Sequence, residues 1–463
     1  MGTSSRKEKN RATLVITAGD GLARRGNAEP GAIPTEREVW PKFDTRRLRD
    51  LSGDDYDISR EEIRDEAGRK PWVWPDEVIH FFCDLHADAN AFLRSLEATG
   101  HVVRTGDRRQ GLGLLPGGEN ARFVIGGDCL DKGPSNFRLL RAIRRLMDSG
   151  ATVDLLAGNH DLRVLLGLTC AERRDPMMSH FFARMGTKCI GLIRELCGEL
   201  GGVDAIRPTV TEREAELRLF PGNDWYERFP TAVEGLIPEG KIELELVRMQ
   251  AKTAQLKQGL AEAGISLAAT LEAVRKGREL FTGGGEFGWF FDEMQLALRS
   301  GSFLFIHAGV DDIISTAIRR AGVERLNRQF RTLVREDLFG LYHGPLGNCF
   351  RTKYRDHNFP FTGFGARDLN RAGIYAIVHG HRNVLRGQQL TLRHGVLNFA
   401  CDASVDINTR RSEGLEGHGA AVVTFDPRGH VLGKSTDYPY VKTFDAATVF
   451  EMTTFLDPRP AVA

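Results

Sequence analysis

Two short apolar segments, each ending in a polar cluster, constrain the fold of this chain most. Residues 122–126 (RFVIG) run into Gly-Asp-Cys-Leu-Asp-Lys-Gly at 127–133, and residues 153–157 (VDLLA) run into Gly-Asn-His-Asp at 158–161. Apolar runs of β-branched and aromatic residues that stop at glycine are typical of buried strands. Between them, residues 135–149 carry apolar side chains at helical spacing. The sequence therefore predicts a strand, a helix and a strand, with both polar clusters at the ligand-binding end of one α/β sheet.

Three further apolar segments end in polar side chains of the same kinds, at residues 77–83, 302–306 and 374–378. A mixed set of carboxylate, imidazole and amide donors suits Mn²⁺, Fe or Zn²⁺ better than a structural zinc site. Two such cations about 3.5 to 4 Å apart could share one bridging carboxylate and hold a phosphoryl group. The donors at the five strand ends are Asp84, His86, Asp128, Asp131, Asn159, His160, His307, His379 and His381.

Composition excludes several classes of protein. The 463 residues include 63 basic and 62 acidic side chains, so no overall charge favours nucleic acid or an anionic membrane as a partner. No apolar run has the length of a membrane span, and the basic N-terminus lacks the apolar stretch of a signal peptide. Seven cysteines without CxxC spacing argue against a disulfide framework. We therefore expect a cytoplasmic protein without nucleic-acid or membrane partners.

The chain divides into a flexible N-terminal arm and one large α/β domain. Residues 1–35 are polar and basic and predict the arm, with at most one short strand at Thr13 to Thr17. Residues 36–463 form the domain, which a helical insertion interrupts at about residues 165–298. No internal repeat is present.

The insertion is predicted to be helical because it is rich in strong helix formers. Residues 181–200 and 241–281 predict helices, and Gly283-Gly284-Gly285 predicts the hinge that returns the chain to the sheet. The charged residues of these helices are typical of a solvated face. A second interpretation is that the insertion forms a cap over the site and selects the substrate, and the two interpretations are compatible.

The polar clusters occur in the order DxH, GDxxD, GNHD, HAG and GH, at residues 84–86, 127–133, 158–161, 307–309 and 380–381. In this order they resemble the motifs of the calcineurin-like metallophosphoesterases. Within that superfamily the chain is most similar to bacterial serine/threonine phosphoprotein phosphatases. The resemblance covers the blocks between about Val78 and Asp402, and it covers neither the arm nor the insertion.

The resemblance implies a fold and a metal centre. The implied fold is an α/β sandwich of two central β-sheets flanked by helices. The implied cofactors are two divalent metal ions, Mn²⁺ first, with Fe or Zn²⁺ as alternatives. By position in the motifs, one ion would be held by Asp84 and His86, Asp128 would bridge both ions, and the second ion would be completed by Asn159, His307 and His381.

The resemblance also implies a reaction, in which a metal-activated hydroxide attacks the phosphorus of a phosphate ester. His160 would protonate the leaving oxygen as general acid. Asp131 would orient the imidazole of His160 and favour its charged form.

Two basic residues are expected to bind the substrate phosphate. Lys132 stands where the family usually has arginine, so this position keeps its charge and loses the two-pronged hydrogen bond of a guanidinium. Arg351 is the best-placed second phosphate ligand, and its rivals are Arg355 and Arg382.

Four assignments have a structural alternative. His381 matches the Gly-His motif, whereas His379 is more typical of a hydrogen-bonded histidine at a strand end. Asp161 precedes a predicted helix, so it suits an N-terminal cap as well as catalysis. Asp402 ends a strand near the metals in relatives, and a structural role is equally compatible with its position. The fourth assignment concerns Asp128, Asp131, Asn159 and His160, for which an ordinary turn is the alternative to a functional role.

The sequence predicts a hydrolase acting on phosphate monoesters, with a phosphoprotein or a small phosphoester as partner. A serine/threonine protein phosphatase is the finer form of this prediction. The alternative enzyme hydrolyses dinucleoside polyphosphates or phosphodiesters. A hypothesis of another class is a binding protein that keeps the fold without the chemistry. The oligomeric state is left open.

Overall fold

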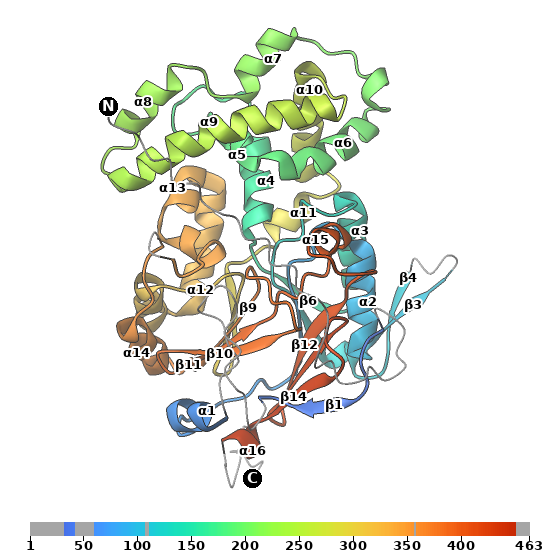
Figure 1. Ribbon diagram of the computed structural model, residues 1–463, viewed down its shortest axis with the longest axis vertical. Helices are drawn as coiled ribbons and strands as arrows, with labels where there is room; N and C mark the ends of the chain where they lie inside the picture. Colours follow the sequence, from blue (N-terminus) through green and yellow to red (C-terminus); the bar gives the residue numbers. More distant parts are fainter. Residues whose placement is uncertain (1–31, 42–59, 107–110, 356–357, 451–463) are drawn as a thin grey trace, which may run out of the picture.

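Two β-sheets packed face to face form the centre of the computed structural model (Figure 1), which describes residues 32–41, 60–106, 111–355 and 358–450. Most of the predicted arm, including the short strand expected at Thr13 to Thr17, lies outside the described residues. The predicted α/β sandwich of two central sheets flanked by helices is confirmed.

The first sheet has seven strands, and its parallel part positions half of the predicted site. Strands β2, β5 and β6 are parallel neighbours, so their carboxyl ends meet at one edge. The remaining strands extend the sheet beyond β2. In sheet order the strands are β1 (Arg37–Val39), β14 (Val441–Asp445), β13 (His430–Ser435), β12 (Ala421–Asp426), β2 (Val78–Phe82), β5 (Ala121–Ile125) and β6 (Thr152–Leu155).

The second sheet has five strands, and it positions the other half of the predicted site. Strands β8, β9 and β11 are parallel neighbours, and the two edge strands run antiparallel to them. In sheet order the strands are β10 (Gln389–Arg393), β11 (Val396–Ala400), β9 (Ala376–His379), β8 (Phe303–Ile306) and β7 (Ala297–Ser300). A separate hairpin pairs β3 (Val102–Thr105) with β4 (Gly111–Leu114).

Aromatic side chains fill the space between the two sheets. Phe425 of the first sheet packs against Phe303, Phe305 and Phe399 of the second, with ring centroids 5.2 to 5.4 Å apart. Phe81 packs against Phe305 at 5.8 Å. Because the strands present β-branched and aromatic residues to both faces, the apolar runs of the sequence end up buried on both sides.

Helices cover the outer faces of both sheets (Figure 1). On the first sheet lie α2 (Ala89–Thr99) and α3 (Asn136–Asp148), and on the second lie α12 (Asp312–Glu336), α13 (Leu338–His343) and α14 (Gly363–Arg371). The shorter elements are α1 (Arg60–Ala67), η2 (Gly118–Asn120), η5 (Pro345–Phe350), α15 (Ile407–Ser412) and α16 (Ala446–Val449).

A helical cap lies between β6 and β7 in the sequence and stands above the carboxyl ends of the strands in Figure 1. We use the word cap for the elements from α5 to α10. They follow α4 (Asn159–Cys170) and precede α11 (Gly288–Asp292). The cap consists of α5 (Phe181–Met185), η3 (Thr187–Cys189), α6 (Ile190–Glu199), η4 (Val203–Ala205), α7 (Glu212–Leu219), α8 (Trp225–Ala232), α9 (Glu239–Glu262) and α10 (Leu267–Phe281).

Two helices predicted as continuous in the insertion are broken at glycine. The helix expected over 241–281 is wrong as one element, because α9 ends before Gly264 (φ 71°) and α10 starts after it. The helix expected over 181–200 is divided at Gly186 (φ 69°). Both glycines have a left-handed backbone conformation that other residues adopt at a cost, and this conformation ends a helix.

The cap shares one continuous apolar core with the helices below it. Buried residues of α5, α6, α9 and α10 join the cluster that contains the outer face of the first sheet. All seven cysteines are buried and unpaired. Within the described residues, no helix has both the length and the apolar character needed to cross a membrane.

Candidate metal centre

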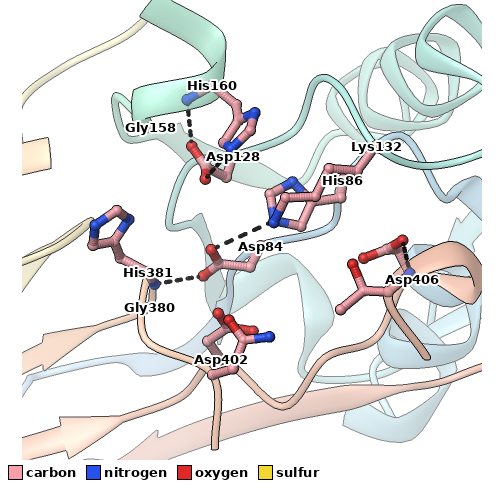
Figure 2. Close-up of polar contacts among 12 residues, drawn as sticks. Asp84, His86, Asp128, Lys132, Gly158, His160, Gly380, His381, Asp402 and Asp406 are labelled. Atoms are coloured by element: carbon pink, nitrogen blue, oxygen red, sulfur yellow. Dashed lines mark hydrogen bonds and ion pairs between the residues drawn. The ribbon is translucent and has the colours of Figure 1, made fainter. Parts of the chain in front are cut away.

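The five strand ends marked by the sequence motifs converge on one site, most of which Figure 2 shows. Asp84 and His86 follow β2, Asp128 follows β5, His307 follows β8 and His381 follows β9. Asn159 and His160 form the first residues of α4, just after β6. Six of these seven side chains are buried, and His381 is half-buried.

Two groups of ligand atoms could each hold a metal ion, and they share one residue. Asp84, His86 and Asp128 form the first group, and Asp128, His307 and His381 form the second. Within each group, all ligand atoms lie within 4.8 Å of one another. Because Asp128 belongs to both, the arrangement suits two neighbouring cations with a common carboxylate.

The ring of His307 is held so that one nitrogen, which has no hydrogen-bond partner, faces the carboxylate of Asp128. Its Nδ1 lies 2.8 Å from the carbonyl oxygen of Gly126, so Nδ1 carries the hydrogen and Nε2 is the acceptor. Nε2 has no hydrogen-bond partner and lies 3.4 Å from Oδ1 of Asp128. Two buried acceptors that face each other need a cation or a proton between them. The donor set therefore fits a metal ion.

Asn159 and His381 meet at the second group. One end of the Asn159 amide lies 2.7 Å from Nδ1 of His381, and the other lies 3.0 Å from the backbone nitrogen of His160 and 3.3 Å from Nη1 of Arg163. With its nitrogen toward His381, the amide satisfies all three contacts. With its oxygen toward His381, it would add an oxygen ligand to the second group, as the resemblance implies. Nε2 of His381 is buried and has no partner.

Lys132 lies at the first group. Its ammonium nitrogen is 2.6 Å from Nε2 of His86, so this cation occupies the position that faces the candidate metal ligands (Figure 2). Nδ1 of His86 has no hydrogen-bond partner. His86 would have to give up this contact with Lys132 if its Nε2 were to hold a metal ion together with Asp84 and Asp128.

His160 and Asp131 form the pair expected for proton transfer. Nδ1 of His160 lies 3.2 Å from Oδ2 of Asp131, and both side chains are buried. The backbone nitrogen of His160 donates to Oδ1 of Asp128 at 2.7 Å. Burial and the nearby guanidinium of Arg163 hold the pKa of His160 well below its usual range. Opposite charge from a bound phosphate would raise this pKa.

Asp161 organises the loop that carries Asp128. Its Oδ2 accepts hydrogen bonds from the backbone nitrogens of Asp128 (2.8 Å) and Gly158 (3.2 Å). Its Oδ1 accepts from Cys129 (2.9 Å) and Leu130 (3.0 Å). Of the two roles that the sequence left open, the contacts support a structural one, because both oxygens are occupied by backbone donors.

Backbone strain is concentrated at the site. In the described part of the chain, eleven residues other than glycine have positive φ, with values from 41° to 69°. For such residues this conformation costs free energy, and it commonly persists where function requires it. Six of the eleven are residues that the sequence assigned to the site, namely Asp84, His86, Asp128, Asp131, Lys132 and His381.

The carboxyl groups of the site are crowded and deprived of water. Burial, with the charge of Asp128 as the second cause, raises the pKa of Asp84 to about 7. Burial likewise raises the pKa of Asp131 to about 7. Although burial alone would raise the pKa of Asp128, His307, His86 and Lys132 hold it below its usual range. Of these three carboxyl groups, that of Asp128 is therefore the most readily ionised and the best suited to bind a cation.

Two residues near the centre do not join the ligand groups. The ring nitrogens of His379 are engaged by the carbonyl oxygen of Gly380 (2.9 Å) and by Nη2 of Arg382 (2.7 Å). His381 is therefore the histidine of this pair that the structure brings to the centre. Asp402 lies beside Asp84 in Figure 2, and burial and the charge of Asp84 raise its pKa well above the usual range.

Arg351 lies in a group of arginines around the hydroxyl of Tyr342. The guanidinium of Arg351 stacks over the Tyr342 ring at 4.1 Å, and its Nε donates to the carbonyl oxygen of Gly347 at 2.9 Å. Nε of Arg184, from the cap, donates to the Tyr342 hydroxyl at 2.7 Å. Burial alone would raise the pKa of Tyr342, but Arg184, Arg163 and Arg351 lower it well below its usual range.

Arg163 connects this arginine group to the metal centre, and the sequence analysis missed it. It interacts with Tyr342 at one side and lies 3.3 Å from the Asn159 amide at the other. Its position four residues after Asn159 on α4 places both on one helical face. This four-residue spacing from Asn159 could have been used to predict Arg163 as a residue of the site.

No protein-family model and no curated protein matches this chain. Among solved structures, the chain is similar to a mutant of a cold-active protein tyrosine phosphatase, with TM-score 0.43, 16% identity, and coverage of 83% of this chain and 85% of that one. It is also similar to the cold-active protein-tyrosine phosphatase of a psychrophile, Shewanella sp., with TM-score 0.41, 15% identity, and coverage of 83% and 84%.

A third similar structure is a protein serine/threonine phosphatase from Saccharomyces cerevisiae, with TM-score 0.36, 12% identity, and coverage of 86% of this chain and 89% of that one. Likeness at these levels is too low to support a statement about activity. Function therefore has to be inferred from the candidate metal centre of this chain.

Proposed function

We propose that this protein is a metal-dependent phosphatase that hydrolyses phosphate monoesters. The observation that carries the proposal is the pair of ligand groups that share Asp128, with the His160–Asp131 pair directly beside them. A shared carboxylate suits two cations that hold one phosphoryl group. An adjacent imidazole with a carboxylate partner suits proton transfer to a leaving oxygen.

Six residues of this chain would hold the two cations. Asp84 and His86 would hold one cation, His307 and His381 the other, and Asp128 both, with the oxygen of Asn159 as a further ligand of the second. When bound, two divalent cations such as Mn²⁺ supply Lewis-acid activation of water and neutralise phosphoryl charge. The buried setting strengthens these interactions because little water screens them.

His160 and Asp131 would handle the proton of the leaving group. The Nδ1 of His160 lies 3.2 Å from Oδ2 of Asp131, and Nε2, which lies 3.9 Å from Oδ2 of Asp128, would donate to the departing oxygen. The pKa of His160 is low in the protein alone because the side chain is buried near Arg163. A phosphate dianion at the centre would favour the imidazolium, so protonation would follow substrate binding.

Basic residues would bind the phosphoryl oxygens. Lys132 already lies 2.6 Å from Nε2 of His86 and would pair with the substrate as a point charge. Arg163, which reaches the Asn159 amide, is better connected to the centre than Arg351. Arg351 would not contact the phosphate and would instead position Tyr342, over whose ring it stacks.

The test compares hydrolysis of an aryl phosphate monoester with that of the matching diester by the full-length chain in Mn²⁺ buffer. Clear preference for the monoester is expected, with loss of activity in a chelator and recovery on addition of Mn²⁺. Preference for the diester would favour the phosphodiesterase alternative. If the purified protein binds no metal and hydrolyses neither compound, the proposal is wrong and a non-catalytic binding protein remains.

A further inference from the structure

A cavity of about 600 Å³ lies between the metal centre and the cap. Its wall combines the loop that follows Asp131, the η3–α6 segment of the cap, and α15. Cavities of this volume are typical of sites for small ligands. The lining residues that matter here are Lys132, Asn136, Lys188, Arg194, Glu195 and Asn408.

The cavity borders the candidate metal centre, because two of its lining residues contact residues of that centre. Lys132 lines the cavity and places its ammonium nitrogen 2.6 Å from Nε2 of His86. Asn136 lines the cavity and accepts a hydrogen bond from the backbone nitrogen of Asp131 at 2.9 Å. A substrate with its reacting phosphate at the metals would therefore have room for its other end in this cavity.

The charge of the cavity wall is strongly positive. Lys132, Lys188 and Arg194 are its cations, and the single acidic side chain in the wall is Glu195. Within the described residues, neither Lys188 nor Arg194 forms an ion pair. Lys188 and Arg194 both come from the cap; Arg194 is exposed, and Lys188 is exposed as a residue although its ammonium group is partly withdrawn from water. The cap therefore contributes the positive charge on the far side of the cavity.

Glu195 keeps its charge but forms no ion pair with these cations within the described residues, because both of its oxygens accept hydrogen bonds from the start of α3. One oxygen accepts from the backbone nitrogen of Asn136 at 2.7 Å and from its side-chain amide at 2.8 Å. The other accepts from the Ser135 hydroxyl and the Phe137 backbone nitrogen, both at 3.0 Å. With four donors satisfied, Glu195 stabilises a helix N-terminus rather than binding cavity ligands.

Partial burial and two neighbouring cations both act on the pKa of Lys188. Burial, followed by the charges of Lys132 and Arg163, lowers the pKa of Lys188 to about 8. An anion in the cavity would relieve this repulsion and favour the charged lysine. A neutral or apolar ligand would leave the repulsion in place.

We propose that the cavity is a second anion subsite, in which Lys188 and Arg194 of the cap bind a second phosphate group on the same substrate. The preferred substrate is then a small ester that carries two phosphate groups, one at the metals and one between the cap cations. This inference rests on the proposed phosphatase function. It gives the helical insertion a specific task, which is selection of doubly phosphorylated substrates.

The experiment uses alkanediol bisphosphates of increasing chain length and the alkyl monophosphates of the same lengths. The full-length, Mn²⁺-loaded protein is assayed for kcat/KM on each compound, and the quantity measured is the ratio of bisphosphate to monophosphate. We expect this ratio to exceed tenfold at the best chain length. Lys188→Met and Arg194→Met should each reduce the ratio toward one, and Lys188→Arg should retain it.

Arg213→Met provides the matched control, because Arg213 is an exposed cap arginine on α7 outside the cavity wall. This variant should keep the ratio of the wild-type protein. A wild-type ratio near one, or a ratio unchanged in both Lys188→Met and Arg194→Met, would overturn the subsite.

A binding measurement separates failure of the subsite from failure of the proposed function. Calorimetry compares inorganic tripolyphosphate with orthophosphate on the same proteins. If no ester is hydrolysed but tripolyphosphate binds at least tenfold tighter and loses this advantage in Lys188→Met, the subsite stands and the phosphatase proposal is wrong. If tripolyphosphate has no advantage over orthophosphate in the wild-type protein, the subsite is wrong whatever the activity.

Discussion

Nε2 of His307 lies 3.4 Å from Oδ1 of Asp128 and has no hydrogen-bond partner. The carbonyl oxygen of Gly126 lies 2.8 Å from the other ring nitrogen of His307 and holds the ring in this orientation. A buried carboxylate and a buried imidazole nitrogen at this separation require a proton or a metal ion near both. The relationship links the two sheets, because Asp128 follows β5 and His307 follows β8.

Asp128→Asn should remove metal from both ligand groups and abolish hydrolysis of phosphate esters. The amide keeps the shape of the side chain but loses the negative charge that two cations would share. Metal content per chain, measured by elemental analysis after dialysis, should fall by more than half. Asp368→Asn is the matched control, because Asp368 is also buried and is held by Thr316 and Arg319 away from the centre. Full metal occupancy with retained activity in Asp128→Asn would contradict the bridging assignment.

His160→Asn should leave both metal groups loaded and slow the reaction according to the leaving group. The backbone contact of residue 160 with Asp128 does not involve the imidazole, so the ligand geometry is preserved. Loss of a general acid typically costs roughly 10²- to 10⁴-fold in rate. We expect a loss of that order in kcat for alkyl phosphates and a much smaller one for a nitrophenyl phosphate, whose leaving group needs no proton. Equal losses on both substrates would argue against the acid role.

The motifs predicted which strand ends meet, because in each motif the donor residues directly follow an apolar strand. Asp84 follows β2 in this way, and His381 follows β9. What they could not locate depends on contacts between distant segments. Arg163 and Tyr342 meet only after α4 and α13 are packed together, and Lys188 reaches the cavity only through the fold of the cap. The break of the long cap helix at Gly264 depends on one left-handed residue, which the helix-forming composition around it concealed.

Lys132→Arg should preserve or lower KM for a phosphate monoester. The guanidinium keeps the positive charge at the centre and adds a second parallel donor for phosphate oxygens. Lys132→Met, which removes the charge, should raise KM about tenfold or more, in line with roughly 1.5–3 kcal/mol for a hydrogen bond to a charged group. Steady-state kinetics on an aryl phosphate measure both. A large loss of kcat in Lys132→Arg would show that the centre requires the shorter ammonium next to His86.

Asp161→Asn should destabilise the protein and lower its affinity for metal, although Asp161 belongs to neither ligand group. The carboxylate accepts four backbone hydrogen bonds, and an amide nitrogen cannot accept the two made to one of its oxygens. Loss of charge-assisted bonds predicts a decrease of roughly 2–4 kcal/mol in the free energy of unfolding. Urea unfolding and a metal titration measure the two effects.

Asp445→Asn serves as control for this prediction, because Asp445 caps α16, which lies at the end of the molecule opposite the cap in Figure 1. It should lose some stability and keep its metal affinity. If Asp161→Asn binds metal as tightly as the wild-type protein, the loop that carries Asp128 does not depend on the Asp161 contacts.

His80 should make the stability of the protein fall in mild acid. The side chain is buried in β2, with Nδ1 2.9 Å from the Thr424 hydroxyl and Nε2 2.9 Å from Nδ1 of His101. Burial, followed by the charges of His101 and Lys434, lowers the pKa of His80 to about 3. Below about pH 6.5 the unfolded chain binds a proton that the folded protein excludes until about pH 3. The contribution of His80 to the free energy of unfolding therefore falls as pH decreases through this window.

The contribution of His80 is isolated by comparing the wild-type protein with His80→Gln, in which residue 80 does not titrate. Each pH unit below 6.5 costs up to about 1.4 kcal/mol, so the change from pH 7 to pH 5 should be about 2 kcal/mol larger in the wild-type protein. Asp84 and Asp131 act in the opposite direction, because their raised pKa values favour the folded state as pH falls below about 7. Since both proteins share these carboxyl groups, urea unfolding at the two pH values cancels them in the difference. Equal pH dependence of the two proteins would mean that His80 is protonated in the folded state at pH 5.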